Sequence, residues 1–249
     1  MARFDLTDEE WAVIGPLLPK RGRGPHRKDD RKVLNGIFYI LRTGAPWRDL
    51  PDRYGPRTTV YNRYVRWGER GVWQRIFEAL AQECEDALVF IDASIVKAHR
   101  AAAGVKKGEL EECIGRSRGG RTSKVHAAVD AAGRPLRLAI SGGQLHDSQM
   151  MDAFLDWGTP PLAIVADKAY GSRKIRQQIA DEGALAVIPS KNNAREPIAH
   201  DISLYRQRNI VERFFCKMKD MRRLATRFEK KARNFLSMVQ LFAIRCWIN

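Results

Sequence analysis

From residue 87 onward, apolar residues follow strand-like and helix-like spacings in a fixed order. The order is three strands, then a helix, a strand, a helix, a strand and a helix. Short apolar strands that alternate with amphipathic helices are typical of a sheet covered by helices. The sequence therefore predicts an α/β fold with a mixed sheet. The predicted strands are Leu88 to Val96, Lys124 to Asp130, Pro135 to Ser141, Leu162 to Ala166 and Leu185 to Ile188, with helices at about 148–157, 172–182, 203–222 and 231–247.

Residues 1–86 follow a different pattern, typical of several short helices. Thr7 and Glu10 form a capping box at the start of the first helix. Further helices are predicted to begin at Asp29 or Asp30 and at Thr58 or Thr59. Short helices with a basic arm suit a helix-turn-helix-like DNA-binding domain, although a plain helical bundle has the same pattern.

The predicted organisation is therefore an all-α DNA-binding domain over 1–86 and a catalytic domain over 87–249. Within the second domain, residues 100–120 are rich in Ala, Gly, Lys, Glu and Arg. That composition predicts a mobile basic loop.

The charge of the chain indicates a polyanionic partner. The chain has 44 Lys and Arg against 29 Asp and Glu, a formal net charge of +15. Nucleic acid is the expected partner, since the basic residues do not gather on one amphipathic anchor. No apolar run approaches the roughly 20 residues that cross a bilayer, and no signal peptide is recognisable. The four cysteines form no Cys-x-x-Cys pair, which favours free thiols in a reducing cytoplasm over a zinc site.

Three acids are the candidate catalytic residues. Asp92 lies in the apolar run from Leu88 to Ser94, Asp167 ends the apolar run that starts at Leu162, and Glu212 lies in a basic helical segment. Two Mg²⁺ ions held by carboxylates are a common solution for phosphodiester chemistry. We therefore expect Asp92, Asp167 and Glu212 to hold two Mg²⁺ or Mn²⁺ ions. The alternative is that the aspartates are inert turn residues, as Asp130 is expected to be.

The segment around Glu212 is expected to contact DNA. On one continuous helix, Tyr205, Arg208, Glu212 and Lys219 fall within about 60° of each other, which suits phosphate recognition better than core packing. The alternative is a solvated face with an Arg208–Glu212 pair. Residues 206–233 contain eleven basic and three acidic residues, which predicts a DNA-tracking surface with steep salt dependence. Further expected DNA contacts are Arg57, Arg63, Arg213, Arg222 and Arg223.

Taken together, these segments resemble bacterial insertion-sequence transposases of the DDE class, which have a ribonuclease-H-like catalytic domain. The spacing Tyr205-x2-Arg208-x3-Glu212-x6-Lys219 matches the Tyr-Arg-Glu-Lys signature of that group. Ile91-Asp92-Ala93-Ser94 and Ala166-Asp167-Lys168-Ala169-Tyr170-Gly171 resemble the segments around its two aspartates. The stretches from Leu6 to Trp11 and from Gly44 to Pro51 resemble its N-terminal domain.

The resemblance implies catalysis by the three acids with Mg²⁺ or Mn²⁺, and phosphate contacts by Tyr205, Arg208 and Lys219. It implies binding to terminal inverted repeats and to target DNA, as a homodimer or larger synaptic complex in the bacterial cytoplasm. Some relatives carry a large β-rich insertion between the second aspartate and the glutamate. Asp167 and Glu212 are only 45 positions apart here, which argues against a hairpin intermediate that depends on such an insertion.

Two other functions remain open at the level of sequence. A non-catalytic repressor derived from a transposase has no need of three like-charged acids. A stand-alone metal nuclease has no need of a helical N-terminal module. Strand-transfer products would separate a transposase from both.

Overall fold

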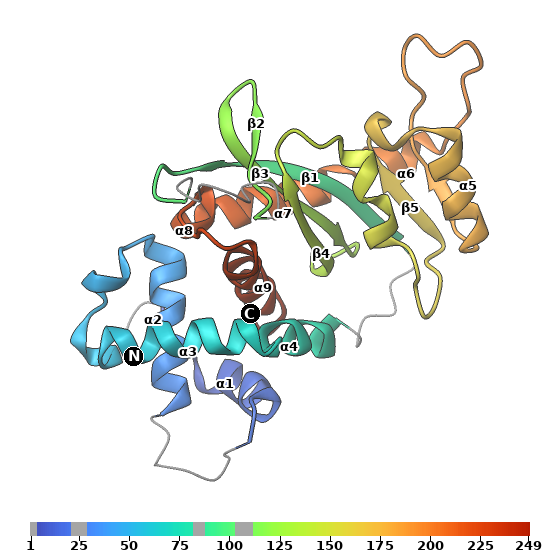
Figure 1. The fold of residues 1–249 in the computed structure, drawn as a ribbon. Helices are drawn as coiled ribbons and strands as arrows, with labels where there is room; N and C mark the ends of the chain where they lie inside the picture. The colour runs from blue at the N-terminus through green and yellow to red at the C-terminus, as the bar shows by residue number, and fades with distance from the viewer. Residues whose placement is uncertain (1–3, 21–28, 82–87, 103–111) are drawn as a thin grey trace.

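The computed structural model describes residues 4–20, 29–81, 88–102 and 112–249. The predicted domain boundary at 86/87 and much of the predicted loop at 100–120 lie outside these ranges. In Figure 1, a sheet occupies the upper part of the molecule and the N-terminal helices lie below it. The C-terminal helix α9 (Ala232–Ile248) runs between them.

The sheet is mixed, as predicted. Strand β1 (Leu88–Ala98) runs antiparallel to β3 (Gly120–Val129) and parallel to β5 (Ala163–Ala166), and β5 is parallel to β6 (Leu185–Val187). Strand β4 (Pro135–Gly142) pairs with β3 on its other side. Within the described residues, the strand order is β2 (Gly115–Ser117), β3, β1, β5 and β6, with β4 on β3 and β7 (Thr226–Arg227) on β1. The α/β fold class is therefore confirmed.

The end of the segment 100–120 is ordered, contrary to the expectation of one continuous loop. Gly115–Ser117 form strand β2, which pairs antiparallel with β3. The Ser117 hydroxyl donates to the Gly120 carbonyl at 3.2 Å, and Gly120 has a φ of +96°. A glycine that accepts this φ allows the tight turn, and composition alone did not reveal the pairing.

Helices cover both faces of the sheet. Phe90 and Val165 pack into the same hydrophobic cluster as α7 (Asn209–Asp220) and α9. Val89 and Ile164 pack into a second cluster with the 3₁₀ helix η4 (Asp147–Phe154) and with α5 (Arg173–Asp181). Successive residues of a strand point to opposite faces, so each strand contributes to both clusters. The helix predicted at 148–157 is thus shorter and of the 3₁₀ type.

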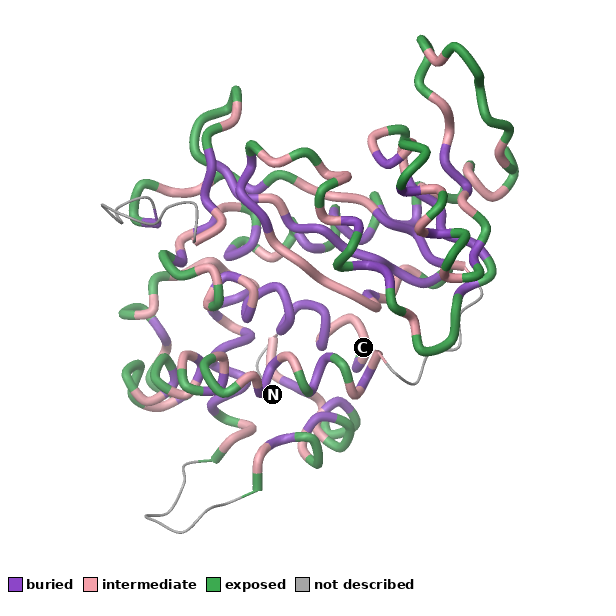
Figure 2. Tube along the Cα trace, turned by 45° about the vertical axis from the view of Figure 1, so that its right-hand side comes forward, coloured by how far each residue is buried: buried purple, intermediate pink, exposed green. Residues whose placement is uncertain are grey.

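The N-terminal helices share the core of α7 and α9. They are α1 (Asp8–Ile14), α2 (Asp30–Thr43), α3 (Arg57–Glu69) and α4 (Val72–Ala81), with 3₁₀ turns η1 (Gly15–Leu17), η2 (Trp47–Asp49) and η3 (Asp52–Tyr54). The Tyr64 hydroxyl donates to the Asn234 carbonyl, which ties α3 to α9. Figure 2 shows buried residues running through the sheet and the helices beneath it. The predicted helical N-terminal region is confirmed, and its hydrophobic core is continuous with that of the rest of the protein.

Local capping signals located two of the N-terminal helices correctly. Thr7 and Glu10 form both hydrogen bonds of the capping box, and Asp29 caps α2. The expected cap at Thr58 or Thr59 is wrong, because α3 begins at Arg57 directly after Pro56. Proline fixes φ near the helical value and needs no partner for an N–H group, so it can precede a helix without a side-chain cap.

The helix predicted over 203–222 is broken, and this changes the geometry of the candidate site. Helix α6 (Ile202–Arg206) ends before a turn at Gln207 and Arg208, and α7 begins at Asn209. The N–H groups of Ile210 and Val211 bond to carbonyls only three residues earlier, which tightens the chain at this point. Tyr205 and Glu212 therefore lie on different helices. A short helix α8 (Arg222–Ala225) and strand β7 (Thr226–Arg227) follow α7.

Replacing Gly44 by alanine is expected to lower the free energy of unfolding by at least about 1–2 kcal/mol. Gly44 ends α2 with a φ of +70°, and an added Cβ would lie 2.9 Å from the Cβ of Arg222. Gly71→Ala is the matched control, because Gly71 has a φ of +64° but only the flexible end of Arg75 nearby. Denaturant unfolding that gives equal losses for both variants would disprove the close approach at Gly44.

Candidate active site

The sheet register brings the two candidate aspartates together. In the parallel pairing of β1 with β5, Ile91 is opposite Ala166. Asp92 directly follows Ile91 and Asp167 directly follows Ala166, and neighbouring strands lie about 4.8 Å apart. The negative charge of Asp167 raises the pKa of Asp92, although burial is the larger cause of that increase. Two carboxylates thus meet at the edge where β5 ends.

Backbone N–H groups hold both carboxylates in place. One oxygen of Asp92 accepts from the N–H of Ala93 at 2.8 Å. Asp167 caps the 3₁₀ helix η5 (Lys168–Tyr170) and accepts from the N–H of Ala169 at 2.7 Å. These bonds restrict each side chain while leaving its second oxygen available to other partners.

Arg208 connects the third acid to the first. Its guanidinium donates to Asp92 Oδ2 at 2.7 Å and also to Glu212 Oε1. Burial lowers the pKa of Arg208, but Asp92 and Glu212 raise it by more, so this cation stays charged. The Asp92 side chain is 18% exposed and that of Glu212 is 52% exposed. Glu212 therefore faces solvent at the rim, one guanidinium away from the buried aspartate.

The donor set fits a hard cation. Carboxylate oxygens are the ligands that Mg²⁺ and Mn²⁺ prefer, and a positive group already lies between Asp92 and Glu212. In the part of the chain that the structure describes, no three Asp, Glu, His or Cys side chains converge closely enough to hold a metal ion. The metal site expected from Asp92, Asp167 and Glu212 consequently stays a prediction.

Several residues expected to contact DNA are accessible. Arg213 and Lys219 are exposed on α7, Arg222 is exposed at the start of α8, and Arg57 is exposed at the start of α3. Tyr205 is half-buried, with its ring 5.4 Å from that of His200. Their accessibility is compatible with phosphate contacts.

Two of the expected DNA contacts are engaged inside the protein. Arg223 is 8% exposed and donates to the buried Glu229 at 2.7 Å, so the expectation that it contacts DNA is corrected. The sequence could not distinguish it from its exposed neighbour Arg222. Arg63 pairs with Asp30, and its guanidinium lies 5.1 Å from the centre of the Trp67 ring. Its contact with DNA would require giving up that pair.

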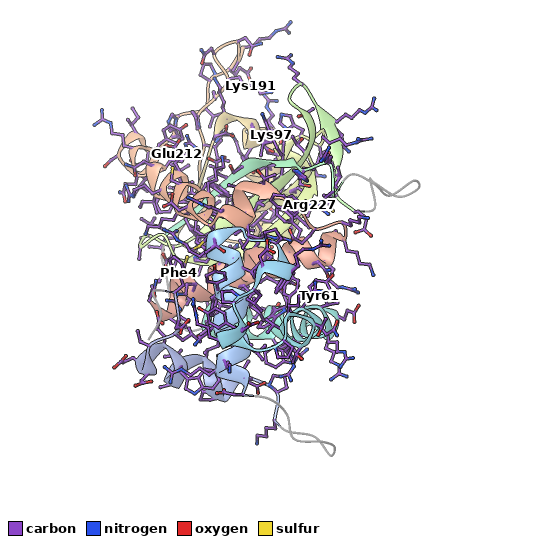
Figure 3. The ribbon with its side chains drawn as sticks, turned by 90° about the vertical axis from the view of Figure 1, so that its left-hand side faces the viewer. Phe4, Tyr61, Lys97, Lys191, Glu212 and Arg227 are labelled. Atoms are coloured by element: carbon purple, nitrogen blue, oxygen red, sulfur yellow. The ribbon has the colours of Figure 1, made fainter. Side chains whose placement is uncertain are left out.

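A pocket beside Asp167 was not anticipated from the sequence. It has a volume of about 410 Å³ and is lined by Asp167, Lys168, Ala169, Lys191, Asn192 and Asn193. In Figure 3, Lys191, Lys97 and Glu212 all lie in the upper part of the view, away from Phe4 and Tyr61 in the N-terminal region. Lys191-Asn192-Asn193 is a short polar run that lies far from Asp167 in the sequence. The sequence alone therefore did not predict that both line the same pocket.

Behind the acids, the opposite face of the sheet contains buried polar groups. His126 is fully buried, with one ring nitrogen 2.8 Å from the Ser141 hydroxyl. Lys124 pairs with Asp147 at 2.7 Å, so Asp147 neutralises a lysine here, while His146 caps η4. The Tyr170 hydroxyl has no hydrogen-bond partner among the described residues. Burial, followed by the charges of Asp147, Asp92 and Asp167, raises the pKa of Tyr170.

Stability is expected to fall as the pH drops from about 6.5 to about 4, in part because of His126. Burial lowers the pKa of His126 to about 4. Asp147 raises this pKa and Lys124 lowers it, each by less than burial does. Between those pH values, the unfolded chain binds a proton at this residue that the folded chain does not, so stability is retained above this range. The effect amounts to roughly 3 kcal/mol at most. Denaturant unfolding at several pH values measures this effect. In His126→Asn, the free energy of unfolding should change less steeply with pH in this range, and an unchanged pH dependence would contradict the prediction.

Two known protein families match most of the chain. Residues 83–247 match the family described as "Transposase DDE domain". Residues 6–77 match the family described as "Putative transposase of IS4/5 family". The two matches correspond closely to the sheet-containing part and to the N-terminal helices. No helix among the described residues is both long enough and apolar enough to cross a membrane.

Two individual relatives are similar to about half of the chain. The chain is 36% identical over 129 residues to the uncharacterized protein y4sN of Sinorhizobium fredii, which covers 51% of this chain and 95% of that protein. It is 33% identical over 128 residues to a putative transposase for the insertion sequence element IS6501 of Brucella ovis. That alignment covers 51% of this chain and 98% of the transposase. A solved structure, the Mos1 transposase paired-end complex with left transposon end, aligns over 82% of each chain with 13% identity and a TM-score of 0.26.

Proposed function

We propose, since the chain belongs to the family of DDE transposases, that it cleaves DNA at the ends of an insertion sequence and joins the freed 3′-hydroxyl to target DNA. The observation that carries this proposal is the meeting of Asp92 and Asp167 at the end of β5, with Glu212 linked to Asp92 through Arg208. Water attack would release each 3′-end, and that hydroxyl would then attack a target phosphodiester. Both steps use the same acids.

Asp92, Asp167 and Glu212 are proposed to hold two Mg²⁺ or Mn²⁺ ions. When bound, such ions stabilise the developing charge on the phosphate and activate the attacking oxygen. The protein contributes rigidity, because Asp92 lies inside β1, Asp167 directly follows β5, and a backbone N–H group bonds to each of them. Glu212 is linked to Asp92 through Arg208, and it projects from α7, whose apolar residues pack against the sheet.

DNA is proposed to lie along the exposed basic residues near the three acids. Tyr205, Arg208 and Lys219 belong to the proposed Tyr-Arg-Glu-Lys signature, and Arg213 lies on the same helix as Glu212. Lys168 and Lys191 line the pocket beside Asp167, where they can neutralise a backbone phosphate. The N-terminal helices, with Arg57, are proposed to recognise the terminal inverted repeat. The working form is proposed to be a homodimer or larger synaptic complex in the bacterial cytoplasm.

A strand-transfer assay with a labelled duplex tests this proposal. The duplex carries the terminal repeat of the element, and a supercoiled plasmid serves as the target, with Mg²⁺, Mn²⁺ or EDTA. We expect metal-dependent nicking at the repeat boundary and a labelled joint product with the plasmid. Nicking without joining would favour a nuclease. Tight, metal-independent binding without nicking would favour a repressor.

A further inference from the structure

Arg208 occupies oxygens that the proposed function assigns to metal. One arm of its guanidinium donates to Asp92 and the other to Glu212. The side chain is 21% exposed, so it is partly buried beside Asp92 but still accessible from solvent. Among the described residues, this double bridge is the contact that joins Glu212 to an aspartate.

A guanidinium and a divalent cation compete for the same carboxylates. Arginine presents its N–H donors in a planar fork that fits two carboxylate oxygens at once. The same fork also fits phosphate, and hydrogen bonds between charged groups are among the strongest in proteins. A DNA phosphate near the site can therefore draw Arg208 away from Asp92 and Glu212.

The position of Arg208 in the chain favours such an exchange. Arg208 lies in the turn between α6 and α7 instead of inside a helix. Its N–H bonds to the Tyr205 carbonyl at 3.0 Å. A change of side-chain rotamer can release Arg208 from both acids while Glu212 stays attached to α7.

We infer that Arg208 is a built-in counter-ion that weakens metal binding by Asp92 and Glu212 until DNA takes Arg208 away. Metal binding and DNA binding then strengthen each other by the same factor, as linkage requires. This arrangement limits metal-loaded, cleavage-competent protein to the DNA-bound state. The inference rests on the proposed function, because it assumes that these acids hold the metal.

Mn²⁺ titration monitored by electron paramagnetic resonance tests this inference without measuring activity. Wild type, Arg208→Gln and Arg208→Lys are compared, with and without a duplex carrying the terminal repeat. Arg206→Gln is the matched control, because Arg206 is exposed and has no acidic partner among the described residues. Circular dichroism and thermal unfolding check that each variant is folded.

Without DNA, Arg208→Gln is expected to bind Mn²⁺ at least about fivefold more tightly than wild type, within the usual range of coupling. Arg208→Lys should fall between them, since a lysine keeps the charge but lacks the fork. The duplex should tighten Mn²⁺ binding to wild type and to Arg206→Gln, but much less to Arg208→Gln. Unchanged or weaker Mn²⁺ binding by Arg208→Gln would overturn the inference.

Asp92→Asn separates failure of this inference from failure of the proposed function. If Mn²⁺ binding depends on Asp92 but is insensitive to Arg208, the counter-ion role is overturned and the proposed metal site stands. If no variant shows Mn²⁺ binding that depends on Asp92, the proposed metal site and the counter-ion role are both overturned.

Discussion

Replacing Asp92 by asparagine is expected to reduce metal-dependent cleavage of a terminal-repeat duplex by at least about a hundredfold. The substitution preserves size but removes the charge on the more buried of the two acids that Arg208 connects. Glu212→Gln should have a comparable effect, because the proposed chemistry needs both carboxylates. DNA binding should persist in each variant, measured by electrophoretic mobility shift.

The matched control for these variants is Asp152→Asn. Asp152 is exposed and accepts a hydrogen bond from Gln178 at 2.7 Å. Its replacement tests whether the loss of any acidic charge reduces cleavage. Cleavage that survives in Asp92→Asn or in Glu212→Gln would mean that a different carboxylate acts in the reaction.

Replacing Arg227 by leucine is expected to lower the free energy of unfolding by about 3–5 kcal/mol. Arg227 is fully buried, and its guanidinium donates to the carbonyls of Cys113, Glu229 and Lys230 and to the Ser123 hydroxyl. Leucine would leave the buried Glu229 carbonyl and the buried Ser123 hydroxyl without their donor, which costs more than the apolar contact returns. Burial lowers the pKa of Arg227, while Cys113 and Glu229 act in the opposite direction.

Urea denaturation of wild type and Arg227→Leu measures this loss. Arg222→Leu is the control, because Arg222 belongs to the same basic run but is exposed; its effect should stay within about 0.5 kcal/mol. Equal effects of the two substitutions would show that the buried hydrogen bonds of Arg227 contribute little to stability.

Local signals in the sequence predicted much of the fold. The spacing of apolar residues located β1, β3 and β4, and the helix predicted at 172–182 matches α5. Long-range effects caused the errors. The helical pattern of the sequence continues across Gln207 and Arg208, so it did not predict the turn there. Strand β2 forms by pairing with β3, which its own composition does not indicate.

The candidate site divides in the same way. Asp167 could be predicted to lie at the end of its strand, because it directly follows an apolar run. Asp92 lies inside β1 and not at its end, and its position beside Asp167 depends on the parallel pairing of β1 with β5. The spacing around Glu212 indicated a role in the same site. The expected single face of Tyr205, Arg208, Glu212 and Lys219 depended on an unbroken helix, which the structure lacks.

By itself, the sequence determined the order of most strands and helices and the caps of α1 and α2, because these depend on residues close together in the chain. Only the tertiary structure decided which charges are buried and which are paired. Arg208 meets Asp92 across 116 positions, and Arg227 meets Cys113 across 114. A basic residue has the same local sequence signal whether it faces DNA or a buried partner, so its role depends on which distant segment folds against it.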